Sequence, residues 1–334
     1  MSVSDVLTVS NLTTHFETRA GLIKAVDGVS FTVGRGEVLG LVGESGSGKS
    51  VTGYSIMGLV DPPGRIVSGS IKLGDRELVG LPEDSMRSVR GRQVAMIFQD
   101  PMMTLNPVLR IDTQMIEAIL AHEKVSKKAA LARAQQALEK VGIPAAAERL
   151  KAYPHQFSGG MRQRVAIATA LLNNPALIIA DEPTTALDVT IQSQILAEIQ
   201  QLCAESGTAL IWITHDLTVV AGLANRIAVM YAGRIVETGG VDDVLDNPIH
   251  PYTRGLLGSL PSAAVPGRPL EQIPGSTPSL GRLPPGCSFA PRCRDASDLC
   301  HETAPANIQF ANERQARCHH PINAVPVGAQ QQES

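Results

Sequence analysis

Short apolar runs recur along the 334-residue chain, and polar or glycine-rich residues follow each of them. Four of the runs are continuous, at residues 38–42, 94–98, 177–180 and 210–213. Runs of this kind are typical of parallel strands that are buried on both faces. Because helix-compatible segments separate them, the pattern predicts an α/β fold with a mixed, mainly parallel sheet.

The other strand patterns are shorter. Residues 1–40 suggest short, twisted strands, and Asp27-Gly28 is a turn signal between two of them. Residues 29–33 alternate apolar and polar side chains, as a half-buried strand does. The additional strands predicted are residues 7–9, 29–33, 70–73, 227–231 and 234–237, the last two as a hairpin around Ala232-Gly233.

Helical periodicity dominates residues 102–176. Ser126 is placed to cap a helix within this segment. The apolar face expected on that helix consists of Leu131, Ala134, Leu138 and Val141. Further helices are predicted at residues 50–59, 162–172 and 191–204. From residue 261 to residue 286, proline and glycine replace any periodicity, which predicts an extended connector.

Residues 43–50, Gly-Glu-Ser-Gly-Ser-Gly-Lys-Ser, fit the phosphate-binding pattern G-x-x-x-x-G-K-[ST]. Glycines let the backbone turn its N–H groups inward, and the following helix N-terminus adds positive potential. A plain glycine-rich turn is the alternative, and the strand-then-helix context disfavours it. We expect Lys49 to reach the β- and γ-phosphates and Ser50 to ligate Mg²⁺. The predicted nucleotide-binding residues are Gly43, Ser45, Gly46, Ser47, Gly48, Lys49 and Ser50.

Polar residues end three other predicted strands, where α/β folds place functional side chains. Asp181 could hold Mg²⁺, and Glu182 could activate a water molecule as a general base. Two acids at one strand end need a cation to offset their desolvation. Gln99 could touch metal or water, or it could simply begin a turn. His215 could contact a γ-phosphate, or it could be an ordinary hydrogen-bonding residue.

Two more positions have a functional and an ordinary interpretation. Ser158-Gly159-Gly160 opens a helix whose exposed N–H groups could form a second anion site. A serine cap on an ordinary helix explains the same pattern. Phe16 is a lone aromatic residue in a polar stretch, so it could stack on adenine or be a half-buried strand residue.

The charge balance narrows the possible partners. The 29 Lys and Arg residues nearly match the 32 Asp and Glu residues, which does not suggest a basic face for nucleic acid. The first nine residues lack the layout of a signal peptide, and no apolar run reaches the roughly 20 residues of a membrane span. We therefore expect a soluble chain that other subunits bring to any membrane.

Together these motifs resemble the ATP-binding subunits of ABC transporters. The motifs, in order, are residues 43–50, Gln99, Phe157-Ser158-Gly159-Gly160-Met161, Asp181-Glu182, Asp188 and His215. The usual signature Leu-Ser-Gly-Gly-Gln differs at its first and fifth positions, where this chain has Phe157 and Met161. Pro248-Ile249-His250-Pro251-Tyr252-Thr253, Leu256-Leu257 and four late cysteines are similar to the dipeptide and oligopeptide importer ATPases, most closely to their dipeptide-permease D subunits.

The resemblance implies an ABC-type ATPase domain at residues 1–245 and a C-terminal extension at residues 246–334. The ATPase core would include an antiparallel β subdomain and a helical subdomain at about 102–176. Two subunits would close head to tail, with each ATP held between one phosphate-binding loop and the other subunit's Ser158-Gly159-Gly160. Phe16 would then stack on adenine, and Asp188 would lie in a loop that communicates across the dimer.

The same resemblance implies catalytic roles and partners. Gln99 would sense Mg²⁺, Asp181 would hold its shell, Glu182 would activate water and His215 would hold the γ-phosphate. The subunit would sit at the cytoplasmic face of the inner membrane and power import of di- or oligopeptides. Its partners would be a similar ATPase subunit, two membrane permeases and an external peptide-binding protein. Nickel complexes or opines are alternative cargoes, and a soluble ABC ATPase acting on DNA or ribosomes is the competing class.

Four of the five cysteines crowd the C-terminal region: Cys287, Cys293, Cys300 and Cys318. A disulfide framework is not expected in an ATP-using chain without a signal peptide, so a metal site is the better hypothesis. The spacing lacks a tight C-x-x-C pair, and four thiolates suit zinc or an iron–sulfur cluster. The resemblance implies a [4Fe–4S] cluster, with zinc and free thiols as alternatives. Cys203 is expected to be a core residue.

Overall fold

The computed structural model describes residues 5–19, 21–184, 189–260 and 272–327. The chain divides into two compact units that alternate along the sequence. The first comprises Met1–Leu7, Thr32–Glu37 and Lys72–Trp212; the second comprises Thr8–Phe31, Val38–Ile71 and Ile213–Ser334.

The second unit contains the strand that leads into the phosphate-binding loop. This strand, β3 (Val38–Val42), is buried at all five residues and runs parallel to β9 (Arg226–Tyr231). β9 then returns as the antiparallel β10 (Arg234–Gly240). Ala232 and Gly233 between them have φ values of 47° and 83°, as a tight two-residue hairpin requires. Both the buried parallel strand and the hairpin are confirmed.

A separate sheet in this unit has the strand order β2-β1-β4, with β1 at Asp5–Thr18, β2 at Gly21–Gly34 and β4 at Gly64–Leu73. The turn predicted at Asp27–Gly28 is wrong, because β2 continues through both residues. The backbone N–H of Asp27 donates to Gly233 O at 2.8 Å, and its carboxylate pairs with Arg234 at 2.7 Å. These tertiary contacts stabilise an extended strand, and Gly28 provides the positive φ of 67° that the strand contains there.

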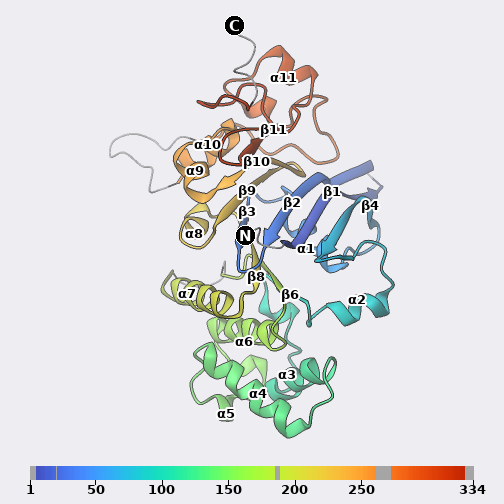
Figure 1. Ribbon diagram of the computed structural model, residues 1–334, viewed down its shortest axis with the longest axis vertical. Coiled ribbons are helices and arrows are strands. Elements are labelled where there is room, and N and C mark those ends of the chain that lie inside the picture. The colour runs from blue at the N-terminus through green and yellow to red at the C-terminus, as the bar shows by residue number, and fades with distance from the viewer. Residues whose placement is uncertain (1–4, 20, 185–188, 261–271, 328–334) are drawn as a thin grey trace. The chain divides into compact units, whose positions relative to one another are not determined.

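The first unit combines strands with a group of helices. β6 (Val94–Ile97) pairs in parallel with β7 (Leu177–Asp181), and β8 (Ala209–Thr214) follows β7 in the strand order. Within the helical group α4 contacts α3, α5 and α6 (Figure 1). The other elements of this unit are β5 (Arg76–Glu77), α2 (Glu83–Val89), η1 (Pro101–Met103), α3 (Ile111–Leu120), α4 (Lys127–Lys140), α5 (Ala146–Arg149), η2 (Pro154–Gln156), α6 (Gly159–Leu171) and α7 (Val189–Ser206).

Helix α4 confirms its predicted cap and all but one residue of its predicted apolar face. The Ser126 side chain accepts a hydrogen bond from the backbone N–H of Ala129. Leu131, expected in the core, is 39% exposed. Ala134, Leu138 and Val141 are buried as predicted, and Ala130 rather than Leu131 completes the buried stripe. Ala130 is four residues from Ala134 and therefore shares its face, whereas Leu131 is turned toward solvent.

The C-terminal part of the second unit is attached to β10. β12 (Gln315–Ala316) pairs with β10 and with β11 (Ile308–Gln309). The fully buried Glu237 accepts backbone N–H groups from Ile249 and His250 and pairs with Arg314 at 2.9 Å. The remaining elements of this unit are α1 (Lys49–Met57), α8 (Leu217–Ala221), α9 (Val241–Asp246), α10 (Pro251–Gly258), η4 (Ala290–Arg292) and α11 (Asp298–Glu302).

The structure also describes part of the predicted connector and bears on the predicted fold class. Residues 272–286, the described part of the predicted connector, contain neither helix nor strand. In the described ranges, no helix combines the length and the apolar character that crossing a membrane would demand. Parallel and antiparallel pairing occur alongside helices, so the predicted α/β class with a mixed sheet is confirmed.

Candidate nucleotide-binding site

The phosphate-binding loop connects β3 to α1 as predicted. Two of its glycines are required by the close approach of other backbone segments. A Cβ atom on Gly43 would lie 2.2 Å from Met230 O, and one on Gly48 would lie 2.2 Å from Ala25 O. Gly48 also has a φ of 104°, which strains any residue with a side chain. The outer part of the loop, Ser45 and Gly46, is exposed, so phosphates can reach its backbone N–H groups.

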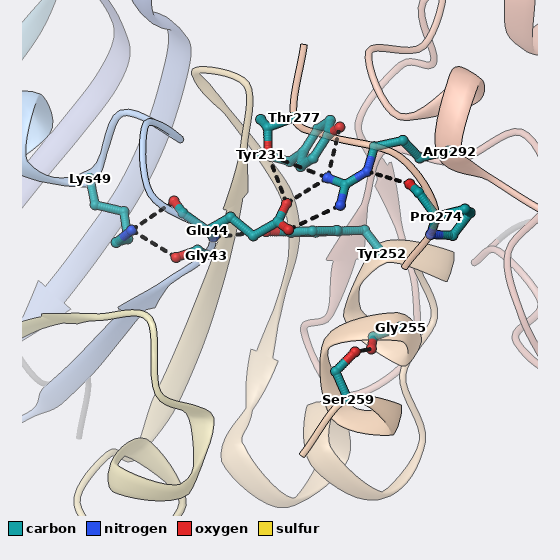
Figure 2. A network of polar contacts seen from close by, with 10 residues as sticks. All are labelled: Gly43, Glu44, Lys49, Tyr231, Tyr252, Gly255, Ser259, Pro274, Thr277 and Arg292. Atoms are coloured by element: carbon teal, nitrogen blue, oxygen red, sulfur yellow. Dashed lines mark hydrogen bonds and ion pairs between the residues drawn. The ribbon is translucent and has the colours of Figure 1, made fainter. Parts of the chain in front are cut away.

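Lys49 is buried, with only 5% of its surface exposed. Its Nζ donates to Gly43 O at 2.7 Å and to Glu44 O at 3.0 Å (Figure 2). It also donates to Ser47 Oγ at 3.5 Å. The loop's own carbonyls therefore hold the ammonium group at the start of α1. An ammonium group held there can pair with the β- and γ-phosphates of a nucleotide. Ser50 follows in the first turn of the helix, where its hydroxyl could ligate Mg²⁺.

The carboxylates of the first unit lie at the end of β7, as the sequence predicted. Asp181, the last strand residue, is 2% exposed. Glu182 follows it with a φ of 44°, an uncommon conformation for a residue with a side chain. Gln99, beyond the end of the parallel neighbour β6, donates from Nε2 to Glu182 Oε2 at 3.2 Å. The structure thus brings Gln99 and Glu182 together, in a position suited to bind and orient a water molecule.

Three other predicted site residues have different outcomes. His215 directly follows β8 and is exposed; its contact with a γ-phosphate stays a prediction. Phe16 is half-buried in β1, and a Cβ on Gly64 would come within 2.5 Å of its ring. One face of Phe16 is therefore packed against the chain; its role with adenine stays a prediction. Asp188 lies outside the described residues.

The Ser158-Gly159-Gly160 segment begins helix α6 and faces outward. Ser158 Oγ accepts the Met161 N–H at 3.3 Å, so the serine cap is present. Ser158 and Gly159 are exposed, whereas Phe157 is buried beneath them at 3% exposure. The large residue at the first signature position thus anchors the helix start in the core. The exposed N–H groups of this 13-residue helix can still receive an anion from outside.

The four late cysteines converge, as the metal-site hypothesis requires. All four are free, and all four line one small cavity. Gly286 makes this possible, because a Cβ there would lie 2.3 Å from Cys300 O. In the described part of the chain, however, no three His, Cys, Asp or Glu side chains are placed to hold a single metal ion.

Three of these thiols combine burial with nearby backbone hydrogen-bond donors. Tetrahedral zinc bound by four cysteines needs all four sulfurs about 2.3 Å from one point. Burial raises the pKa of the Cys287, Cys293 and Cys318 thiols. Hydrogen bonds from backbone N–H groups two residues further along, at Phe289, Asp295 and His320, oppose that rise. Hydrogen bonds to sulfur are among the features that tune iron–sulfur sites. Cys203, in contrast, is an ordinary core residue at 2% exposure, and burial raises its pKa to about 11.

One interaction of the phosphate-binding loop was not predicted. Glu44, a variable position of the motif, forms a two-pronged ion pair with Arg292 of the C-terminal extension (Figure 2). The two residues are 248 positions apart, and the motif pattern places no constraint on Glu44. An acidic residue in a loop that binds anions was the only signal in the sequence, since it needs a nearby cation.

Comparison with known proteins identifies the family. Residues 26–185 match the ABC transporter family, and residues 236–300 match the C-terminal region of oligopeptide/dipeptide transporters. The oligopeptide transport ATP-binding protein AppD of Bacillus subtilis is 50% identical, over 95% of this chain and 97% of that protein. The dipeptide transport ATP-binding protein DppD of Escherichia coli is 46% identical, over 95% of this chain and 97% of that protein.

Solved structures agree at the level of the ATPase core. A dimeric ATP-binding cassette, in a post-hydrolysis state with ADP and phosphate, superposes with a TM-score of 0.64 at 27% identity. The match covers 70% of this chain and 98% of that one. The protein cbiO1 of Clostridium perfringens, part of an ABC transporter complex, gives 0.62 at 26% identity, covering 73% and 92%. The chain therefore belongs to the ATP-binding subunits of ABC transporters, within the oligopeptide and dipeptide transporter family.

Proposed function

We propose that this protein is the ATP-hydrolysing subunit that powers import of di- or oligopeptides through a membrane ABC transporter. The observation that supports this most strongly is the 50% identity to an oligopeptide transport ATP-binding protein over 95% of the chain. That likeness includes the C-terminal region typical of this family as well as the ATPase core. The ATPase domain is proposed to span residues 1–245 and the extension residues 246–334.

The proposed catalytic roles follow from the chemistry of each group. The 43–50 loop and Lys49 bind the phosphates, Phe16 stacks on adenine and His215 contacts the γ-phosphate. Ser50, Gln99 and Asp181 would hold Mg²⁺, which would neutralise phosphate charge when bound. Glu182 accepts a proton from the attacking water, and Gln99, hydrogen-bonded to it at 3.2 Å, orients that carboxylate.

Hydrolysis is proposed to need two ATPase subunits. The exposed Ser158-Gly159-Gly160 surface would cover the ATP held by a similar partner subunit. A helix N-terminus is suited to this because its free N–H groups and dipole favour the phosphate charge. Asp188 is proposed to relay the state of one site to the other. The dimeric, ADP-bound cassette that this core resembles supports the two-chain arrangement.

The remaining partners and the location are proposed from the family. Two membrane permeases and an extracytoplasmic peptide-binding protein complete the importer, with this subunit peripheral at the cytoplasmic face. If so, a tagged chain purified from detergent-solubilised membranes should retain a second ATPase and two permeases, identifiable by mass spectrometry. Recovery with ribosomes, and with no membrane protein, would favour a non-transport ABC ATPase instead.

We further propose that Cys287, Cys293, Cys300 and Cys318 hold a [4Fe–4S] cluster. The shared cavity of the four thiols and the backbone N–H donors near three of them support a thiolate-bound centre at this place. Anaerobic purification should yield about four iron and four sulfide per chain, since four thiolates suit one such cluster. Replacing Cys300 by Ser should reduce the iron content, whereas replacing Cys203, a core residue outside the cavity, should not. One zinc per chain without iron would overturn the cluster.

A further inference from the structure

The C-terminal extension contacts the phosphate-binding loop directly, through an ion pair between Arg292 and Glu44 (Figure 2). Arg292 Nη1 donates to Glu44 Oε2 at 2.6 Å, and Nη2 donates to Oε1 at 3.0 Å. This two-pronged geometry fixes the carboxylate in direction as well as in distance. Thr277 Oγ1 donates a further hydrogen bond to Glu44 Oε2 at 3.0 Å. Arg292 and Thr277, which donate these three hydrogen bonds, both lie beyond position 271.

The ion pair is sheltered from solvent. The Arg292 side chain is 5% exposed, and the Glu44 side chain is 30% exposed. Burial acts to raise the pKa of Glu44, but the hydrogen bonds and charge of Arg292 outweigh it and lower the pKa. The hydrogen bond to Glu44 raises the pKa of Arg292 in turn. The pair is therefore charged, and removing either member would leave the other without its main partner.

The backbone of Glu44 connects this ion pair to the rest of the phosphate-binding loop. Its N–H donates to Tyr252 Oη at 2.9 Å, so α10 holds the same residue from a second direction. Its carbonyl accepts from Lys49 Nζ at 3.0 Å and from the Ser47 N–H at 3.2 Å. The position of Glu44 thus influences where the phosphate-binding ammonium and the inner turn of the loop lie.

Arg292 is itself held by the turn between two of the clustered cysteines. It ends η4 (Ala290–Arg292), which lies between Cys287 and Cys293. Its Nε donates to Pro274 O at 2.9 Å, and its guanidinium lies 5.9 Å from the centre of the Tyr231 ring. Phe289 packs against Tyr231, with ring centres 5.3 Å apart, and also lines the cysteine cavity. The order of the cysteine turn therefore determines whether Arg292 can reach Glu44.

We propose that Arg292 is a positioning residue for the phosphate-binding loop, and that it couples nucleotide affinity to the order of the cysteine-containing turn. The proposal rests on the proposed ATP-binding function and adds a regulatory contact to it. The coupling is reciprocal: an ordered turn favours ATP binding, and bound ATP favours the ordered turn.

The test compares dissociation constants for a fluorescent ATP analogue in full-length variants. Arg292→Met keeps an aliphatic side chain beside Tyr231 but removes the guanidinium group that binds Glu44. It should weaken binding about ten-fold, within the 5- to 150-fold range usual for coupled sites. Arg292→Lys should recover part of the loss, because it restores the charge without the two-pronged geometry. Glu44→Ala should also weaken binding, and Glu44→Ala with Arg292→Met should be no weaker than the worse single variant.

Arg87→Met is the matched control. Arg87 lies 3.5 Å from Glu83 on α2, where the two side chains are 72% and 57% exposed. Its affinity should stay within two-fold of the wild type. If Arg292→Met binds as tightly as the wild type, the proposal is overturned; should this variant not fold, unchanged affinity in Glu44→Ala overturns it equally. A wild-type chain that binds no ATP would instead refute the proposed function.

Hydrogen exchange gives an independent readout of the coupling. Saturating ATP should slow amide exchange in residues 287–293 of the wild type. Saturating ATP should not change amide exchange of the same residues in Glu44→Ala. A role of Arg292 in stability alone would leave exchange of the turn insensitive to ATP in both proteins. That result would contradict the proposal.

Discussion

Replacing Glu182 by Gln is expected to stop ATP hydrolysis while ATP binding persists. Glu182 lies at the end of β7 beside the buried Asp181, and Gln99 is hydrogen-bonded to its carboxylate. An amide cannot accept the proton of the attacking water but fills the same space. Because general-base catalysis typically contributes 10²- to 10⁴-fold, we expect turnover to fall about 1,000-fold. Phosphate release and nucleotide binding, measured on the same preparation, check the two parts of this expectation.

A glutamate elsewhere in the same unit serves as the control. Glu123 pairs with Arg133 in the helical region and is far from any strand end in the sequence. Glu123→Gln should keep turnover within about two-fold, since this half-buried ion pair lies in a helical region without any of the proposed catalytic residues. Near-normal turnover in Glu182→Gln would show that another group acts as the base.

Replacing Gly159 by Asp should abolish hydrolysis without harming the fold of the chain. A Cβ on Gly159 meets no atom within 4 Å, so the side chain has room. Gly159 is the first residue of α6, where a carboxylate favours the helix by about 0.3–1 kcal/mol. In the proposed two-subunit site, however, that carboxylate would face the partner's ATP phosphates. We expect a loss of activity of at least about 100-fold, because repulsion replaces a favourable anion contact.

Two measurements separate this effect from simple damage. Chemical denaturation should show Gly159→Asp to be at least as stable as the wild type, and its affinity for ATP should be unchanged. Gly159→Ala, which adds the Cβ without the charge, should retain most of the activity. Full activity in Gly159→Asp would mean that this surface does not cover a nucleotide.

The parts of the fold that the sequence predicted are those in which local pattern and tertiary environment agree. The runs at β3, β6, β7 and β8 are apolar because they are buried, and the residues after them are polar because the strands end there. The phosphate-binding loop has a fixed pattern because its backbone needs glycine, as the close approaches at Gly43 and Gly48 show. Each of these features depends on a few consecutive residues, so the sequence alone is enough to predict it.

The parts that escaped prediction depend on distant partners. The strand through Asp27–Gly28 persists because Gly233 and Arg234, some 200 residues later, hold Asp27. The Arg292–Glu44 pair joins an unconstrained loop position to a turn in the extension. The convergence of the cysteines could be anticipated only from their number and composition. Their shared cavity, and the N–H groups around the thiols, required coordinates.

Peptide uptake by the reconstituted complex is the most direct test of the proposed function. The tagged complex would be placed in liposomes that contain ATP, with a labelled peptide and the peptide-binding protein outside. Peptide is expected to accumulate only when ATP is present, and Glu182→Gln is expected to abolish accumulation. Accumulation without ATP, or an undiminished rate with Glu182→Gln, would contradict the proposed function.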